Sequence, residues 1–366
     1  MSTKVEAARS AGSGWGQVAG VVSLVAVVVS LLVLSFVWPG ARGEATGLSI
    51  AVTGDAELVD EFLAGAGEGL GEVVDLVQVD DRDEAHQGIL SREFIGGIVL
   101  TSDTPEVLTA SANGQVPAAF MSELSSGLQT VLDAQVYSGV MAGIRGAIDQ
   151  GVAPAAALAQ TPEELPEVTV TDVVPYSEGD SNGVGATVAG IPLTVGALLA
   201  GIVIAFTLTG RWQRISAVLG LGVGGGLLLT LVLSTWLNVY PGSFGALWLA
   251  LGLSLTATSG LFVGLHSALG RAGLGIAAAT TLFAAMPWAA FAVPYAFLPA
   301  GLGHLGQWMI PGATGTLTRV VGYFPDASAA GSWWVLACWA ALGLALSLIP
   351  RRTQRTSPEV GDGGTR

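Results

Sequence analysis

The segment VGATVAGIPLTVGALLAGIVIAFTLTGRWQRIS, residues 184–216, is a long uncharged run that ends at two arginines. An α-helix rises about 1.5 Å per residue, so 184–208 is long enough to cross a hydrocarbon core of about 30 Å. The next apolar run begins directly after Arg211 and Arg214. The segment therefore predicts two membrane-spanning helices joined by a short charged turn.

Further spans follow from the same criterion. The uncharged run 215–270 is too long for one helix and is broken by NVYPGS at 238–243, so it is expected to form two spans. Prolines from Pro287 onward limit the next straight helix. The first apolar run has no convincing cleavage site and is expected to be an uncleaved anchor. The six expected spans are 18–38, 184–208, 215–237, 244–265, 273–294 and 332–349.

The composition places the chain in a membrane and divides it into two parts. Only 11% of its residues are charged, whereas soluble domains carry about 25%. The net charge of −14 is uneven, because 24 Asp and Glu but only four Arg lie between Arg42 and Asp180. The acidic segment 40–183 is therefore expected to be a separate domain, and nucleic acid is not an expected partner of either part.

The basic residues near the span ends predict the orientation. With a cytoplasmic N-terminus, segments 1–17 and 350–366 lie inside and only Arg42 and Arg319 lie near span ends outside. RWQR is then a cytoplasmic turn held against the inner leaflet, with Trp212 as an interfacial anchor. The basic residues on the inner side are Lys4, Arg9, Arg211, Arg214, Arg271, Arg351, Arg352 and Arg355.

The acidic segment has the pattern of a small α/β domain. Short β-branched runs alternate with amphipathic ones, which predicts a β-α-β-α-β unit followed by a long helix and one more strand. The expected strands are 48–53, 73–79, 95–100 and 166–175, and the expected helices are 55–70, 83–94 and 116–148. The fold class is thus an α-helical polytopic membrane protein with six transmembrane helices and an extracytoplasmic α/β domain inserted between the first two.

No pattern for a cofactor or a catalytic site stands out. The acidic side chains fit either a solvated face or a divalent-ion site, but no calcium-loop spacing occurs. GDSNG at 179–183 matches a nucleophile elbow only in letters, because no buried strand precedes Ser181. Cys338 is the single cysteine and is expected to be a small core residue. We expect no enzyme activity and no cofactor.

Glycines within the expected spans indicate close helix packing. GLGVGG at 220–225 resembles a dinucleotide fingerprint, but it lies inside an apolar run rather than between a strand and a helix. Small residues allow helix backbones to approach each other in membranes. The glycines expected at helix interfaces are Gly220, Gly224, Gly260 and Gly264.

The sequence has no motif that would supply free energy for transport. The spans contain no carboxylate for a proton relay, and the single lysine, Lys4, excludes a P-loop. If the protein moves a solute uphill, the free energy is expected to come from another chain.

The loop 295–331 is too apolar for an exposed loop and too rich in glycine and proline for a span. Its part 298–328 is expected to form a re-entrant or interfacial helix covered by protein. Arg319 is expected to pair with Asp326 or with a lipid phosphate, or to act as a plain interfacial anchor. The candidate pathway residues of this loop are His304, Trp308, Arg319 and Asp326.

Three stretches together resemble the type-2 ABC exporter permeases, in particular the phage-infection-protein branch. They are DEAHQGILSREFIGGIVL at 83–100, LPAGLGHLGQWMIPGATGTLTRVVGYF at 298–324 and the WWVLACWAALGLAL that follows. The resemblance implies a homodimeric permease driven by a separate cytoplasmic ATPase, which docks on a coupling helix between the second and third spans. That position is occupied here by TGRWQRIS, which is short for a docking helix.

Two functions remain open from the sequence. The first is the membrane subunit of an export system in the plasma membrane, moving an amphiphilic or envelope-related substrate. The alternative is an envelope scaffold or receptor-like protein whose outer domain binds a partner while the spans anchor it.

Overall fold

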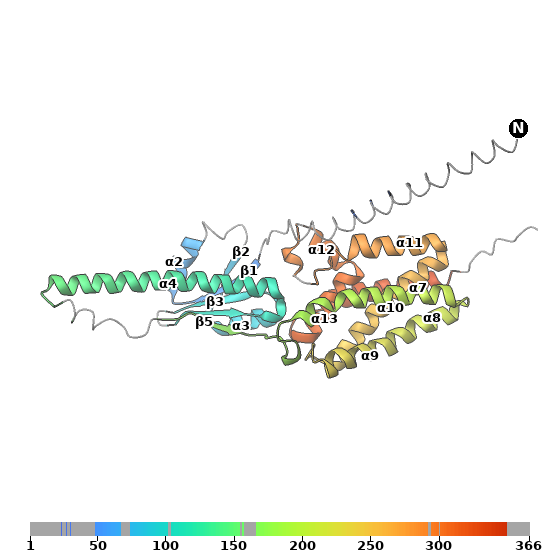
Figure 1. Cartoon of the computed structure of the whole chain (residues 1–366), viewed down its shortest axis with the longest axis horizontal. Coiled ribbons are helices and arrows are strands. Elements are labelled where there is room, and N and C mark those ends of the chain that lie inside the picture. The colour runs from blue at the N-terminus through green and yellow to red at the C-terminus, as the bar shows by residue number, and fades with distance from the viewer. Residues whose placement is uncertain are drawn as a thin grey trace, which may run out of the picture.

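The computed structural model describes residues 48–66, 74–101, 104–153, 166–291, 294–299 and 301–349, together with positions 23, 27, 30 and 156. An α/β sheet domain is followed by a helical bundle, and the two lie end to end (Figure 1). Four helices of the bundle are long and apolar enough to cross a membrane, which indicates a multi-pass membrane protein. The expected first span and the two terminal segments lie outside the described residues.

The domain is built on one mixed five-stranded sheet. Strands β1 (Leu48–Gly54), β2 (Val74–Gln78) and β3 (Gly96–Leu100) are parallel, as the β-α-β-α-β pattern predicts. Strand β4 (Glu106–Thr109) pairs antiparallel with β3, and β5 (Thr169–Asp172) pairs parallel with β4. The order is β2-β1-β3-β4-β5, so the only strand that was not expected, β4, joins the parallel unit to the final strand.

Both faces of the sheet are covered by helices. Along β1 the side chains alternate, so Ile50 and Val52 pack with α2 (Ala56–Ala66) and with the first part of α4 (Gln115–Asp149). Ala51 lies on the opposite face, in the cluster that contains Ala85 and Ile89 of α3 (Arg82–Leu90). Each crossover therefore places its helix on a different face, as right-handed connections from a central strand require.

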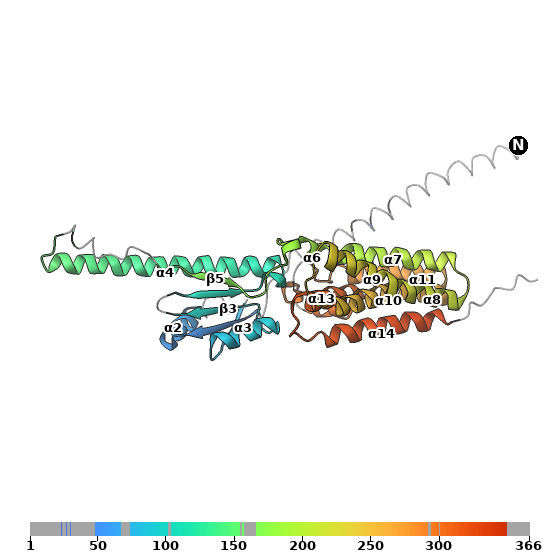
Figure 2. The same cartoon turned by 90° about the horizontal axis from the view of Figure 1, so that it is seen from below.

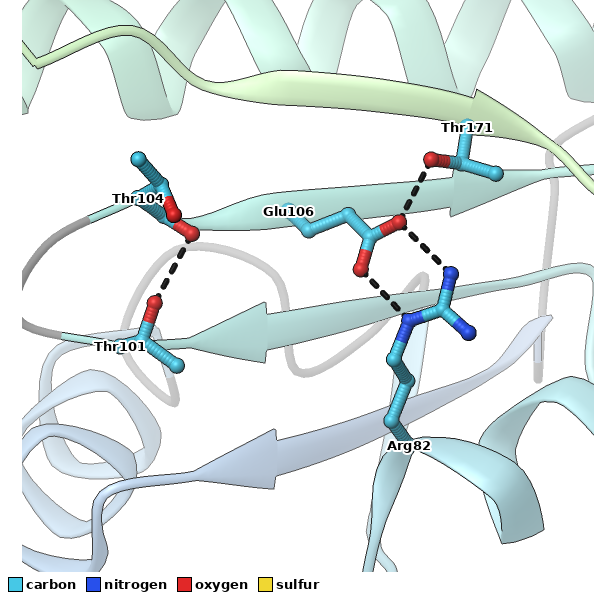
Figure 3. A network of polar contacts seen from close by, with 5 residues as sticks. All are labelled: Arg82, Thr101, Thr104, Glu106 and Thr171. Atoms are coloured by element: carbon cyan, nitrogen blue, oxygen red, sulfur yellow. Dashed lines mark hydrogen bonds and ion pairs between the residues drawn. The ribbon is translucent and has the colours of Figure 1, made fainter.

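Charged residues at the start of α3 make hydrogen bonds that stabilise the helix end and attach the helix to the sheet. Asp81 caps the helix by accepting the Glu84 N–H at 2.8 Å, and Glu84 in turn accepts the Asp80 N–H at 2.7 Å. Arg82 binds Glu106 of β4 through two hydrogen bonds of 2.7 and 2.8 Å, and Thr171 of β5 donates a third (Figure 3). Arg82 and Glu106 therefore join the start of α3 to β4, and Thr171 extends the contact to β5.

Helix α4 is much longer than the sheet it covers. Its first part packs through Met121, whereas its second part projects past the sheet (Figures 1 and 2). Apolar side chains remain exposed there, among them Tyr137 at 68% of its surface. The projecting part of α4 is therefore an unpartnered apolar arm in the described structure.

The four long helices of the bundle coincide closely with four of the expected spans. Val184–Thr207 consists of α6 (Val184–Val188) and α7 (Gly190–Thr207), and Phe244–Leu269 is α10. Arg211–Trp236 is a continuous run of α8 (Arg211–Gly220), η3 (Leu221–Gly225), α9 (Gly226–Thr230) and η4 (Leu231–Trp236). Ala330–Ser347 is α14. Helix α10 is mostly buried, so it forms the centre of the bundle.

The region expected as a fifth span is shorter than predicted. Its helix runs through α11 (Arg271–Ala279) and η5 (Thr280–Ala285) and ends before Pro287 rather than at 294. Met286 still has helical backbone, but Pro287 has no N–H to donate to the preceding turn, which explains this end. The following loop contains η6 (Tyr295–Phe297), α12 (Leu302–Gln307) and α13 (Ile310–Tyr323), and α13 is buried against α10 and α14.

Glycines bring α10 into close contact with its neighbours, but two of the expected positions, Gly220 and Gly224, make no such contact among the described residues. A methyl group added to Gly220 or Gly224 would meet nothing within 4 Å, so neither packs against another described helix. Instead Gly226 lies against Gly252 of α10, where an added methyl group would stand 2.7 Å from the Gly252 Cα. Gly222 lies on the same face, and its carbonyl oxygen would stand 2.6 Å from a methyl group on Gly252.

The second glycine contact agrees with expectation. Methyl groups on Gly264 of α10 and on Gly343 of α14 would each stand 2.4 Å from the other helix's backbone. Gly260 of α10 belongs to the same contact, because its carbonyl carbon is the atom nearest to a methyl group on Gly343. Glycine thus lets α10 and α14 pack at backbone distance.

Candidate functional site

The α/β domain and the bundle meet at a junction built mainly from tyrosines. The hydroxyl of Tyr323 in α13 donates to the Val239 carbonyl, and the hydroxyl of Tyr240 donates to the Ala186 carbonyl at 3.3 Å. The rings of Tyr176 and Tyr240 pack edge-on against Tyr323 at 6.2 and 5.8 Å. One buried cluster continues from the sheet into this junction, which fixes the domain on one end of the bundle.

The RWQR turn, which is the expected coupling position, lies at the opposite end. Helix α7 ends at Thr207 and α8 begins at Arg211, so only 208–210 separate them and no separate helix lies between. Arg211 lies 5.9 Å from the ring centroid of Trp212, and Trp212 is 63% exposed, as expected of an interfacial pair.

Arg214 does not hold the turn against lipid, contrary to our expectation. It is only 4% exposed. Its guanidinium donates to the Leu208 and Ala205 carbonyls at 2.7 and 3.1 Å and to the Ser267 hydroxyl at 3.0 Å. The arginine therefore ties three helix ends together from within the bundle.

A groove opens between the loop 295–331 and α14. It has a volume of about 550 Å³ and is lined mostly by apolar and aromatic side chains, and we call it the α14 groove. Trp308 and Trp334 flank it and are 71% and 72% exposed, while Trp339 closes it by donating its Nε1–H to the Trp308 carbonyl at 2.9 Å. Cys338 also lines the groove and is exposed rather than a core residue.

Polar groups gather along one side of the α14 groove. The Thr316 hydroxyl donates to Gln307 Oε1 at 2.6 Å, whereas Gln307 Nε2 is buried and has no hydrogen-bond partner in the described part of the chain. The His304 ring packs edge-on against Tyr295 at 5.2 Å. A buried donor without an acceptor is energetically costly. Gln307 Nε2 is such an unsatisfied donor, and Gln307 lines the apolar α14 groove.

A second cavity adjoins the α14 groove and reaches the α/β domain. Its volume is about 360 Å³, and it shares Tyr295, Thr316 and Ser328 with the groove. The far wall comes from the domain and includes Arg92, Glu93 and Asn113, so we call it the junction cavity. An apolar groove beside a helix bundle thus continues into a polar cavity beneath a separate domain.

Arg92 gives the junction cavity its positive side. Its guanidinium lies 5.2 Å from the ring centroid of Phe324, which joins the domain to the bundle. Burial, and then repulsion from the guanidinium of Arg319, lower the pKa of Arg92 to about 10, so it stays charged at neutral pH. The one ion pair between described residues is Arg82 with Glu106, so no described carboxylate neutralises Arg92.

The candidate pathway residues separate into two groups. His304 and Trp308 come together in the α14 groove. Arg319 is 7% exposed and donates to the Phe291 carbonyl at 2.8 Å, while Asp326 is exposed and forms no ion pair with a described residue. The described residues therefore show no pairing of Arg319 with Asp326, and the burial of Arg319 leaves little of its side chain for a lipid phosphate.

Sequence reasoning did not identify Arg92, Gln307, Thr316 or the tryptophans of α14 as site residues. One signal for Arg92 was present, since it is one of only four arginines in the acidic segment. No signal in the sequence indicates that the end of α3 faces the loop 295–331.

Comparison of the chain with models of protein families, with curated proteins and with solved structures finds no match.

Proposed function

We propose that this chain is the membrane-spanning subunit of an export system and that it moves an amphiphilic substrate out of the plasma membrane. The observation that carries the proposal is the pairing of the apolar α14 groove with the polar junction cavity. An amphiphile needs both environments side by side, because its tail is stable only out of water and its head only among polar groups.

The orientation of the bundle supports export rather than uptake. With Arg211 and Trp212 at the cytoplasmic surface, as the distribution of basic residues indicates, both cavities lie in the outer half of the bundle. A substrate that enters the α14 groove sideways from the membrane leaves through the junction cavity beneath the outer domain.

The free energy for uphill movement comes from a partner in this proposal. The apolar helices Val184–Thr207 and Arg211–Trp236 carry no carboxylate for a proton relay. We propose a homodimer that works with a separate cytoplasmic ATPase. Since only 208–210 separate α7 from α8, such an ATPase needs further contacts, for which the ends of α10 and α11 around Gly270 are the nearest surface.

Affinity purification of the tagged full chain from its native membranes tests this proposal. We expect two copies of the chain together with a stoichiometric P-loop ATPase and one enriched class of envelope amphiphile. An Arg211→Gln variant changes an exposed side chain at the turn, so we expect it to lower ATPase recovery without unfolding the bundle. Recovery of neither an ATPase nor an enriched amphiphile from the wild-type chain contradicts the export function.

One observation favours the alternative function, an envelope scaffold or receptor. The projecting part of α4 exposes Tyr137, Met141 and Ile148, and exposed apolar side chains on a projecting helix suit a protein partner. In the purification above, this function predicts a stoichiometric envelope protein that Tyr137→Ser releases. The export function predicts that Tyr137→Ser leaves the enriched amphiphile unchanged.

A further inference from the structure

We propose that the α14 groove and the junction cavity together bind one anionic phospholipid-like molecule, whose tail lies in the groove and whose headgroup phosphate pairs with Arg92. This inference rests on the proposed function, because it specifies the chemical class of the exported amphiphile. It is carried by the position of an uncompensated guanidinium at the polar end of an apolar groove.

The charges around the junction cavity favour an anion. Arg92 lines the cavity, and Arg319 lies close enough to repel it, so two guanidinium groups share one region. Glu93 is the only carboxylate in the wall of the cavity among the described residues, and it forms no ion pair with Arg92 there. A phosphate suits this place because a guanidinium binds it with charge-assisted hydrogen bonds.

The backbone at Arg92 supports a dedicated role for its side chain. Arg92 has a φ of 63°, in the left-handed region that a glycine usually occupies after a helix. Its N–H completes the end of α3 by donating to the Ile89 carbonyl at 3.1 Å. With this backbone conformation, the guanidinium of Arg92 lies over the ring of Phe324, where the α/β domain meets the bundle.

The unused donor of Gln307 supplies the link between head and tail. Its Oε1 accepts a hydrogen bond from Thr316, a residue that lines both cavities. The Nε2 atom then has no acceptor among the described residues. An ester or phosphate oxygen of the bound molecule would satisfy this donor, which a hydrocarbon tail alone would not do.

The single cysteine of the chain provides a direct probe. Cys338 is exposed and lines the α14 groove, so a bound tail should shield it from alkylation. The purified full chain in a neutral maltoside detergent is alkylated at Cys338 in the presence of phosphatidylglycerol, of phosphatidylcholine or of inorganic phosphate. The measured quantity is the lipid concentration that halves the alkylation rate.

We expect phosphatidylglycerol to protect Cys338 at a concentration about tenfold lower than phosphatidylcholine does, as one charge-assisted contact typically gives. Arg92→Gln should remove this preference, Arg92→Lys should keep part of it, and Glu93→Gln should increase it. Arg145→Gln is the matched control, because it removes the same charge from α4 without touching either cavity. Inorganic phosphate alone should not slow alkylation, since it cannot fill the groove.

Several results would overturn the proposal. Equal protection by the two lipids, no protection by either, protection by inorganic phosphate alone, or an unchanged preference in a folded Arg92→Gln variant would each do so. The assay contains no ATPase and no transport, so its outcome is separate from that of the export function. Protection of Cys338 together with recovery of neither an ATPase nor an enriched amphiphile would keep the lipid site and reject export, whereas an ATPase complex without protection would do the reverse.

Discussion

Gly343 of α14 lies directly against Gly260 of α10, because a methyl group on Gly343 would stand 2.4 Å from the Gly260 carbonyl carbon. The wall of the α14 groove is the same helix α14, so this backbone contact also fixes the position of the groove. A methyl group at this contact would push α14 away from α10 and so change the shape of the α14 groove.

Gly343→Ala should therefore lower the stability of the bundle. Overpacking of a tight contact costs about 1–3 kcal/mol, since backbone atoms cannot move aside as a flexible side chain can. Gly224→Ala is the control, because a methyl group there meets open space. Thermal unfolding of the full chain in detergent measures both, and equal midpoints for the two variants would contradict the packing described for α10 and α14.

Arg214→Gln should be far more harmful than Arg211→Gln. The first removes hydrogen bonds to two carbonyls and one hydroxyl within the bundle, whereas the second changes an exposed side chain at the turn. Because buried acceptors are left unpaired, the loss is expected to reach about 2–4 kcal/mol. Denaturant titration of helix content checks this expectation, which fails if the two variants unfold at the same concentration.

The Arg82–Glu106 pair gives the α/β domain a pH-dependent contribution. Hydrogen bonding from Arg82 holds the pKa of Glu106 below its usual value, so the stability it adds is present above about pH 4.3. That contribution is lost as the pH falls further, through the lowered pKa. Glu106→Gln should cost about 0.5–1 kcal/mol at pH 7, the range of a partly exposed pair, and less at pH 3.

Hydrogen exchange of β4 and β5 in the full chain measures this effect at each pH. Glu61→Gln, on the exposed side of α2, is the control and should leave exchange in these strands unchanged. A Glu106→Gln variant that is equally protected at pH 7 would show that the ion pair adds nothing to the domain.

The orientation predicts which surfaces are accessible from outside the cell. In a Cys338→Ala background, Glu57→Cys should react with a membrane-impermeant maleimide on intact cells, because the proposed orientation places α2 outside the cell. Thr209→Cys, in the turn between α7 and α8, should react only after permeabilisation. The opposite pattern would place the α/β domain in the cytoplasm and would contradict export through the junction cavity.

Much of this fold could be predicted from the sequence because its signals are local. Apolar runs predicted the four long helices, and alternating runs predicted four strands of the sheet. Strand β4 was missed, since Glu106–Thr109 is too short for a periodic signal. The early end of the helix at Ala285 follows from Pro287, which we had treated only as a limit or a kink.

The site could not be predicted, because it depends on which faces meet. Glycines occur at 220, 222, 224, 225 and 226, and the sequence does not indicate which of them faces α10. Likewise, Arg214 and Arg319 looked like interfacial charges, whereas the fold buries both. Arg92 and Gln307 are 215 positions apart and come to neighbouring cavities only through the junction of the two parts.

The most direct test of export through the α14 groove is to fill the groove in cells and to measure the amphiphiles at the cell surface. Cys338→Phe adds a ring inside the groove, whereas Ala341→Phe adds the same ring to an exposed position of α14 that does not line it. We predict that deletion of the chain and Cys338→Phe lower the same anionic amphiphile at the surface, and that wild type and Ala341→Phe restore it. Surface amphiphiles that are unchanged by deletion and by Cys338→Phe would contradict the account.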